Sequence, residues 1–438
     1  MADMNGKLWE TRPLETWVRA KDLRLSHYRE VMTGREEGKL VIAGGADTPM
    51  AIVAGLGDHV YLAGEPYGAS IAFDTEFSER CVEAVEARGY ARDMCGYMRN
   101  FWGSMYEDRY LFGGGFPKPD FCLQLHLCDT QAKWWQAVGE HLGVPFFGID
   151  FPVWIKGERL ESRQEYMVAQ MHDCIQWMET VTGRRYDDEK LVGAVRNTLE
   201  TSSLWGEIML LNRAVPAPLD QKSIFTLYTG SVLMRYRPEA VEFYRLLRNE
   251  VRDRVRDRIA AVAVERCRLL DDGQPPWYFL RFYRLLEQYG AVVVGSHYSM
   301  FLAGDVRVTE SGEWTPLPTP EQEGGRLESR GDALEALARW CLDRDHFEVY
   351  SYPLRKGPLH VRMAREWGVN GAILHLNRGC EGISCGNPES RLALLEAGIP
   401  VMTLDFNMGD EREFDEAQVK DMLESFAESL GLKRLDGP

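Results

Sequence analysis

Hydrophobic and polar positions follow two different periods along the chain, and the period predicts which element forms. Residues 1–38 place apolar side chains three and four positions apart, which is the spacing of one helix face. The runs at 39–45, 119–127 and 143–151 are short and apolar and lie between turn-forming residues, as buried strands do. Helical patterns separate these runs, and the alternation predicts the β-α-β units of a parallel sheet.

The middle of the chain has a different pattern. Between residues 156 and 285 long amphipathic stretches dominate and strand signals are few, which predicts a helical region. Strand-like apolar runs return at 291–299, 371–376 and 401–406, again with helical patterns nearby. A polar loop rich in Gly, Glu and Pro is predicted for residues 304–330. The chain is therefore expected to begin and end in α/β segments.

Two distant segments end in the same way. LHLCDT (125–130) leads through a helical pattern to GVPFFGIDF, and LHLNRGC (374–380) leads through a helical pattern to GIPVMTLDF. This internal match predicts two related α/β domains with parallel, flavodoxin- or Rossmann-like sheets. Their predicted limits are 1–155 for the N-terminal α/β domain, 156–285 for the helical region and 286–438 for the C-terminal α/β domain.

Cys128 and Cys380 follow the two matching strands. In an open parallel sheet, ligands bind beyond the carboxyl ends of the strands. Two such edges that face each other would make one cleft between the domains. The sequence therefore predicts a shared site to which each domain contributes a cysteine.

Composition narrows the possible functions. The 438 residues are 45% hydrophobic and 27% charged, as in an ordinary globular protein. A net charge of −16 argues against a nucleic-acid partner, because neutralising phosphates requires cationic side chains. No apolar stretch approaches the roughly 20 residues of a membrane span, and no secretory pattern is visible. We therefore expect a cytoplasmic protein without membrane contact.

The nine cysteines divide into two groups. Because cytoplasmic proteins seldom carry a disulfide framework, we expect most of the nine to be free core thiols. This group comprises Cys81, Cys122, Cys174, Cys267 and Cys341, which lie within helical or strand patterns. Cys95 lies instead beside Gly96 in a predicted turn, just as Cys128 and Cys380 lie beyond strands.

Three thiolates from distant loops would suit a cubane iron–sulfur cluster, with one iron left open to another ligand. Cys95, Cys128 and Cys380 are the candidate ligands, and Cys385 in the same loop as Cys380 is a fourth candidate. Zinc is the alternative metal, although structural zinc normally uses close ligand pairs, which the sequence lacks. No phosphate-binding G-x-x-x-x-G-K-[ST] motif occurs, so we do not expect the chain itself to hydrolyse nucleotide. The sequence identifies no proton donor.

These cysteine segments resemble those of the benzoyl-CoA reductase / 2-hydroxyacyl-CoA dehydratase family. The resemblance extends over nearly the whole chain and rests on ADTPMAIVAGLG (46–57), RDMCGYMRNFWG (92–103), CLQLHLCDTQAKWW (122–135) and the run that starts at GAILHLNRGC (371–380). Within the family, GDHVYLAGEPYG and FGGGFPKPDF are most similar to the B-type catalytic subunit of ATP-dependent, class I benzoyl-CoA reductase.

The resemblance implies an enzyme of anaerobic aromatic degradation. It implies that Cys95, Cys128 and Cys380 hold a [4Fe-4S] cluster and that a homologous second catalytic subunit pairs with this chain in a hetero-oligomer. It also implies an ATP-hydrolysing activator, supplied by ferredoxin, whose low-potential electrons reduce an aromatic acyl-CoA to a cyclic dienoyl-CoA. The isolated chain is then expected to be inactive.

The aromatic residues beside these cysteines would form an apolar wall that excludes water, with simple core packing as the alternative. They are Tyr97, Phe101, Trp102, Trp134 and Trp135.

Three other functions stay open at this point. A 2-hydroxyacyl-CoA dehydratase would use the same ligands to eliminate water. A reductase of small molecules would carry a double-cubane [8Fe-9S] cluster, for which Cys385 or Cys122 could supply further thiols. An electron carrier or assembly scaffold would need four protein ligands and a closed cluster, whereas a catalyst needs three ligands and a cleft.

Overall fold

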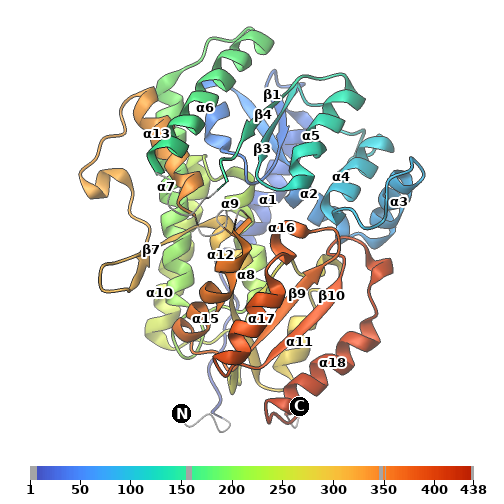
Figure 1. Cartoon of the computed structure of the whole chain (residues 1–438), viewed down its shortest axis with the longest axis vertical. Coiled ribbons are helices and arrows are strands. Elements are labelled where there is room, and N and C mark those ends of the chain that lie inside the picture. The colour runs from blue at the N-terminus through green and yellow to red at the C-terminus, as the bar shows by residue number, and fades with distance from the viewer. Residues whose placement is uncertain (1–6, 154–159, 345–348, 351, 436–438) are drawn as a thin grey trace.

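The computed structural model describes residues 7–153, 160–344, 349–350 and 352–435, and two parallel sheets of four strands each organise this part of the chain (Figure 1). The N-terminal sheet has the order β2-β1-β3-β4. Its strands are β1 (Leu40–Gly44), β2 (His59–Ala63), β3 (Phe121–His126) and β4 (Phe146–Asp150). The strands predicted at 39–45, 119–127 and 143–151 are therefore confirmed.

The C-terminal sheet has the order β10-β9-β5-β6, again with every neighbouring pair parallel. Its strands are β5 (Cys267–Asp272), β6 (Ala291–Ser296), β9 (Gly371–Asn377) and β10 (Val401–Phe406). Read from the other edge, the order is β6-β5-β9-β10, which is the connectivity of the first sheet. The prediction of two related α/β domains is confirmed.

Helices flank the N-terminal sheet. They are α1 (Thr16–Thr33), the 3-10 helix η1 (Met50–Leu56), α2 (Gly64–Ala72), α3 (Thr75–Glu86), α4 (Gly96–Tyr106) and α5 (Asp129–Leu142). The amphipathic pattern of residues 1–38 corresponds to α1, which buries Ala20, Tyr28 and Val31. Helix η1 ends at Gly57, whose φ of 85° explains why glycine closes it.

The predicted helical region contains α6 (Leu160–Thr182), α7 (Asp188–Leu211), α8 (Gln221–Leu227), α9 (Thr229–Met234) and α10 (Pro238–Asp257). Figure 1 shows α7 and α10 side by side along one flank of the molecule. Pro238 at the first turn of α10 and Arg258 at its left-handed end, with φ of 56°, set the limits of this helix.

One element differs from the sequence expectation. Residues 267–272 continue an apolar pattern that predicts helix, but they form β5, an inner strand of the C-terminal sheet. All six residues of β5 are buried, so both of its faces are covered and the polar alternation that marks a half-exposed strand is missing. Strand β5 belongs to the C-terminal sheet but lies before residue 285, where the sequence predicts the end of the helical region. The limits of the three predicted regions stay a prediction.

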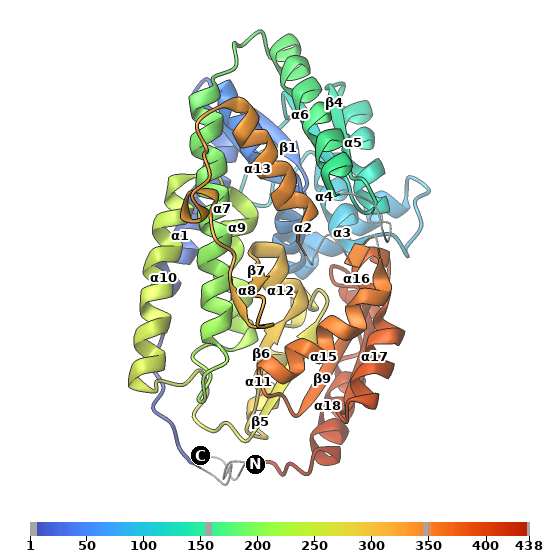
Figure 2. The same cartoon turned by 60° about the vertical axis from the view of Figure 1, so that its left-hand side comes forward.

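The remaining elements complete the C-terminal half. They are η2 (Trp277–Phe279), α11 (Phe282–Glu287), α12 (His297–Ala303), β7 (Val306–Val308), β8 (Trp314–Pro316), η3 (Pro320–Glu323), α13 (Arg330–Leu342), η4 (Pro353–Arg355), α15 (Lys356–Glu366), α16 (Glu381–Ser384), α17 (Asn387–Glu396), η5 (Glu411–Glu413) and α18 (Glu416–Ser429). The predicted polar loop 304–330 carries the antiparallel hairpin β7–β8. Helix α13 then returns to pack on α6 and α7 (Figure 2). None of the described helices is long and apolar enough to cross a membrane.

The two α/β segments touch directly at the start of α4. Asn100 Nδ2 and Ser78 Oγ both donate hydrogen bonds to Gly409 O at 2.9 Å, across more than 300 positions of sequence. A β-carbon on Gly379, whose φ is 72°, would lie 2.5 Å from Asp93 O. Only glycine allows this approach, which brings the segment before Cys95 against the segment before Cys380.

Candidate functional site

Each of the three predicted cluster cysteines is the last residue before a helix. Cys95 precedes α4, Cys128 precedes α5 and Cys380 precedes the short α16. The backbone N–H of Gln131 donates to Cys128 Sγ at 3.4 Å, and the side-chain amide of Gln274 donates to Cys380 Sγ at 3.1 Å. Such donors favour negative charge on sulfur, because they stabilise a thiolate more than a thiol.

The three thiols line one cavity at the junction of the two α/β segments, which we call the thiol cavity. It is a small cavity, with a volume of about 50 Å³. Besides the three cysteines, its lining includes Asp47, Glu65, Tyr97, Gln131, Trp134, Gln274, Tyr298 and Tyr350. The structure therefore brings together the three residues that the sequence placed in one site.

The chemistry of these donors suits an iron–sulfur cluster. Burial raises the pKa of the Cys95 thiol to about 12 and that of Cys128 well above its ordinary value, and the other cysteines of the cavity raise both pKa values further. Burial also raises the pKa of Cys380, although Gln274 Nε2 donates to its Sγ at 3.1 Å. Three thiolates so close together require a positive partner, and metal binding displaces their protons.

The other cysteines lie away from this cavity. Cys122 lies in β3 and is fully buried, whereas Cys385 is exposed at the end of α16, and neither lines the thiol cavity. The remaining four are buried within the core, namely Cys81, Cys174, Cys267 and Cys341. The cavity thus offers three sulfurs, the number that leaves one iron of a cubane open.

A buried carboxyl group also faces the thiol cavity. Glu65 lies in the first turn of α2, and its two oxygens accept hydrogen bonds from Ala46 N–H (2.8 Å) and from Gln131 Nε2. Trp135 Nε1 in turn donates to Gln131 Oε1 at 2.5 Å and fixes the amide. Burial, together with the nearby Asp47, raises the pKa of Glu65 to about 8, so the carboxyl group carries a proton at neutral pH.

Sequence reasoning missed Glu65 and Gln131. The available signal for Glu65 was an acidic residue directly after an apolar strand, in the run YLAGEPYG. Gln131 carried no signal, because a glutamine in the first turn of an amphipathic helix is an ordinary surface residue by pattern alone. Only the fold, which brings α5 against Gly64 at the start of α2 and against Gly45 directly after β1, gives both residues a role.

The raised pKa of Glu65 predicts a pH dependence of stability. A group with a raised pKa stabilises the folded chain fully below its unfolded-state pKa, and this contribution is lost as pH rises toward the folded-state pKa. The wild-type chain should therefore lose stability between about pH 5 and pH 8, by up to a few kcal/mol at about 1.4 kcal/mol per pKa unit. In Glu65→Gln this slope should flatten, as measured by urea unfolding at both pH values.

Glu79→Gln is the matched control, because Glu79 is exposed on α3 and should leave the slope unchanged. An equally steep slope in Glu65→Gln and wild type would show that Glu65 does not hold the proton.

The predicted aromatic wall is formed by two of its five candidates. Tyr97 and Trp134 line the thiol cavity. The other three, Phe101, Trp102 and Trp135, are buried behind them, and Trp135 stacks on Trp134 with ring centroids 5.1 Å apart. Exclusion of water and core packing therefore both apply, to different members of the set.

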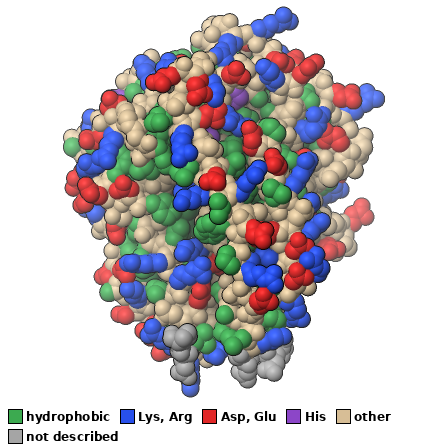
Figure 3. Space-filling view, turned by 180° about the vertical axis from the view of Figure 1, so that it is seen from behind, with side chains coloured by type: hydrophobic (Ala, Val, Ile, Leu, Met, Phe, Trp, Pro, Cys, Tyr) green, Lys and Arg blue, Asp and Glu red, His purple; other side chains and the backbone are tan. Residues whose placement is uncertain are grey.

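A larger pocket lies beyond this aromatic layer, and we call it the outer pocket. Its volume is about 500 Å³, and α1, α2, α8, α9 and η2 form its sides. Apolar groups make up most of its lining, among them Trp17, Phe73, Phe112, Phe225, Val232 and Trp277. Figure 3 shows the face that carries α1, where hydrophobic side chains gather near the middle and lysine and arginine side chains flank them.

Three cations line the outer pocket, and no described carboxylate does. They are Lys21 and Arg24 of α1 and Lys222 of α8, and within the described chain none of them forms an ion pair. Trp277 of this pocket donates from Nε1 to Tyr97 Oη of the thiol cavity at 2.6 Å. The two spaces are therefore neighbours, separated by aromatic side chains.

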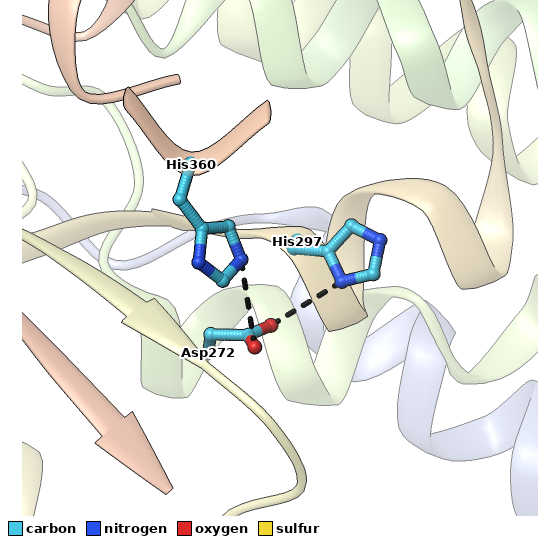
Figure 4. Close-up of side chains that lie close together, drawn as sticks. All are labelled: Asp272, His297 and His360. Carbon is cyan, nitrogen blue, oxygen red and sulfur yellow. Dashed lines mark ion pairs between the residues drawn. The ribbon is translucent and has the colours of Figure 1, made fainter. Parts of the chain in front are cut away.

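A second group of side chains has metal-ligand chemistry. Asp272, His297 and His360 are fully buried, and their ligand atoms lie within 4.8 Å of one another (Figure 4). Lys356 Nζ lies 2.8 Å from Asp272 Oδ2, so a positive charge is already present beside the carboxylate. None of these four residues lines the thiol cavity.

Comparisons with known proteins give one family model and several relatives. A family model described as "2-hydroxyglutaryl-CoA dehydratase, D-component" matches residues 46–430. The (R)-2-hydroxyisocaproyl-CoA dehydratase alpha subunit of Clostridioides difficile is 25% identical over 421 residues, which cover 95% of this chain and 96% of that subunit. The (R)-phenyllactyl-CoA dehydratase alpha subunit of Clostridium sporogenes is 25% identical over 434 residues, covering 94% and 97%.

A further relative is a reductase. The B-type subunit of the benzoyl-CoA reductase of Thauera aromatica is 26% identical over 365 residues, which cover 80% of this chain and 79% of that relative. All three relatives are subunits of enzymes named for CoA thioesters. The matches confirm the family resemblance of the chain and the prediction of an enzyme, and they support a hetero-oligomer.

Proposed function

The chain belongs to the 2-hydroxyglutaryl-CoA dehydratase D-component family, and from this premise we propose that it is the iron–sulfur catalytic subunit of an enzyme acting on an acyl-CoA thioester. One observation carries the proposal. Three thiols from two α/β segments, two of which accept hydrogen bonds at sulfur, line one cavity together with a protonated carboxyl group.

In this proposal Cys95, Cys128 and Cys380 hold a [4Fe-4S] cluster. When bound, the cluster supplies one-electron transfer at low potential and one iron open to the substrate. The protein holds the three sulfurs at the ends of buried segments and excludes water with Tyr97 and Trp134. Burial of this kind also sets the potential of such a cluster.

Glu65 is the proposed proton-holding residue of the reaction. Its carboxyl group lines the same cavity as the three thiols, and the amide of Gln131 fixes its orientation. A pKa near neutral lets one residue both give up and take back a proton, which is what a general acid or base needs.

The outer pocket suits the coenzyme A part of the substrate. Its apolar walls can take the pantetheine arm, and its three cations can bind phosphate groups at the opening. The acyl group would then point through the aromatic layer of Trp277 and Tyr97 toward the thiols.

The cations of the outer pocket give a binding prediction. The double variant Lys21→Glu with Lys222→Glu should weaken binding of free coenzyme A by roughly a hundredfold or more, because two charge-assisted contacts of about 1.5–3 kcal/mol each are lost. Isothermal titration calorimetry of the anaerobic protein measures this. Lys433→Glu is the control, because Lys433 is exposed outside the pocket. Equal affinity of the double variant and the control would place the coenzyme elsewhere.

The reaction itself has two candidates. We propose the reduction of an aromatic acyl-CoA to a cyclic dienoyl-CoA, as in an ATP-dependent benzoyl-CoA reductase, on the strength of the B-type segments and the match to the Thauera aromatica reductase. Dehydration of a 2-hydroxyacyl-CoA is the second candidate. It is favoured by the dehydratase alpha subunits, which this chain matches over 96% and 97% of their length.

The proposed partners follow from the same family. They are a homologous second catalytic subunit, an ATP-hydrolysing activator and ferredoxin as the electron source. The test combines the chain with these proteins, ATP and either benzoyl-CoA or a 2-hydroxyacyl-CoA under anaerobic conditions. A cyclic dienoyl-CoA supports the reductase, and an enoyl-CoA supports the dehydratase. If the chain is a double-cubane reductase of small molecules or an electron carrier, neither product should form.

A further inference from the structure

The buried group around Asp272 connects the core of the C-terminal sheet to the loop that carries Cys380. Asp272 ends β5, His297 begins α12 and His360 lies in α15. His297 Nδ1 lies 3.4 Å from Asp272 Oδ1, and His360 Nε2 lies 3.5 Å from Asp272 Oδ2 (Figure 4). A metal ion bound by these residues would be one explanation for the group, but the position of Lys356 favours another.

Lys356 has the surroundings of a buried ammonium group. Its side chain is 1% exposed, and its Nζ lies 2.8 Å from Asp272 Oδ2. The same nitrogen donates hydrogen bonds to Ile383 O and, at 2.5 Å, to Asn387 Oδ1. An ammonium group has three N–H bonds, and three oxygen atoms surround this one. Lys356 therefore supplies the positive charge that balances Asp272.

The charge state of Asp272 agrees with this assignment. Burial acts to raise its pKa, but Lys356 and the two histidines together hold the pKa well below its ordinary value. Burial lowers the pKa of His297, which keeps this ring neutral at pH 7. Asp272, His297, His360 and Lys356 thus surround one ion pair, and the buried protein interior screens its charges poorly.

The ion pair contacts the short helix that begins directly after Cys380. Ile383 of this helix accepts a hydrogen bond from Lys356 Nζ with its carbonyl, and the next residue, Ser384, donates from its N–H to Cys380 O at 3.1 Å. Asn387, the second acceptor for Lys356, donates from Nδ2 to His375 O of β9 at 3.0 Å. Lys356 therefore fixes both ends of the segment from Ile383 to Asn387 behind the cysteine.

We propose that Lys356 is a positioning residue for Cys380 and that its pairing with Asp272 keeps either buried charge from shifting the electron affinity of the iron–sulfur cluster held there. This inference rests on the proposed function. The ammonium group favours the more negative, reduced state of a nearby cluster, and the carboxylate favours the oxidised state. Because the two charges are buried, each acts on the cluster more strongly than an exposed charge would.

Lys356 and Asp272 carry opposite charges, so removing one or the other should change the potential of the cluster in opposite directions. Lys356→Met leaves the Asp272 carboxylate without its partner, and the cluster should become harder to reduce. Asp272→Asn leaves the ammonium without its partner, and the cluster should become easier to reduce. We expect each variant to change the reduction equilibrium about tenfold, which is 59 mV for a one-electron couple. The double variant should lie near wild type.

The measurement is the midpoint potential of the holoprotein, followed by electron paramagnetic resonance during an anaerobic redox titration. Iron is quantified in every sample first. Lys356→Arg keeps the positive charge and should keep the wild-type potential, even where the longer side chain lowers iron content. Where Lys356→Met does not fold, Asp272→Asn decides, because only an effect of charge predicts that this variant is easier to reduce than wild type and Lys356→Arg.

Three outcomes would overturn the inference. The first is an unchanged potential in both single variants, and the second is a shift in the same direction in both. The third is zinc or another divalent metal at one ion per chain that is lost in His297→Ala and His360→Ala, which would make the group a metal site. A wild-type chain that binds no iron would instead overturn the proposed function, so the two failures are distinguishable.

Discussion

Replacing Cys95, Cys128 or Cys380 singly by alanine should remove most of the bound iron from the anaerobically purified chain. The wild-type chain should bind about four iron and four acid-labile sulfide atoms, as one cubane cluster does. The three thiols line one cavity, and each is the only sulfur that its segment contributes there. Loss of one therefore leaves a site with two ligands, which does not hold a cubane, and turnover should fall to background.

Cys122→Ala and Cys385→Ala are the matched controls for the cysteine series. Cys122 is enclosed in β3 and Cys385 is exposed to solvent, and neither lines the cavity, so both variants should keep wild-type iron. About eight irons per chain, lost also in Cys385→Ala or Cys122→Ala, would favour the double-cubane alternative. Wild-type iron in any of the three single variants would remove that cysteine from the ligand set.

Arg99→Met should destabilise the folded chain by about 3 kcal/mol. Arg99 is fully buried in α4, and its Nη1 lies 3.0 Å from Asp410 Oδ2 and 3.3 Å from Glu86 Oε1. Breaking a buried ion pair costs about 3–5 kcal/mol because the partner charge stays buried. The lower end applies here, since Arg412 Nη2 remains 2.8 Å from Asp410 Oδ2.

The consequence should extend to the cluster. Arg99 lies one turn after Cys95 and binds Asp410, which follows β10 in the C-terminal segment. Arg99→Met should therefore loosen the contact that brings Cys95 toward Cys380, and iron content should fall with stability. Denaturant unfolding of the metal-free chain measures the first effect, and iron analysis measures the second.

Arg256→Met is the control for Arg99→Met. Arg256 pairs with Asp253 on the exposed face of α10, and such surface pairs contribute about 0–1 kcal/mol. A loss of stability no larger than that of this control would mean that Arg99 does not hold the two segments together.

Much of the fold could be predicted from the chain because its strands are short, apolar and separated by helical periods. The similar sequence segments 125–151 and 374–406 correctly predicted a structural repeat, since both sheets place their strands in the same order. Strand β5 was missed for the opposite reason. An inner strand that is buried on both faces has no alternation, and by pattern it continues the helical stretch before it.

Only part of the candidate site could be predicted from the sequence. The cysteines could be recognised because they follow strands or turns and because their segments resemble those of a family. Glu65, Gln131 and Gln274 could not be recognised, since their roles depend on which distant segments meet at the cavity. No local pattern indicates that Gly379 packs against Asp93, or that Lys356 lies behind Cys380.

The central claim is that one iron–sulfur cluster lies between Cys95, Cys128 and Cys380. The most direct test is an anomalous difference map at the iron absorption edge, from crystals of the anaerobically purified chain. We expect one strong peak within the thiol cavity, bounded by the three sulfurs. A peak between Asp272, His297 and His360 instead, or no iron peak in a crystal grown without oxygen, would contradict the claim.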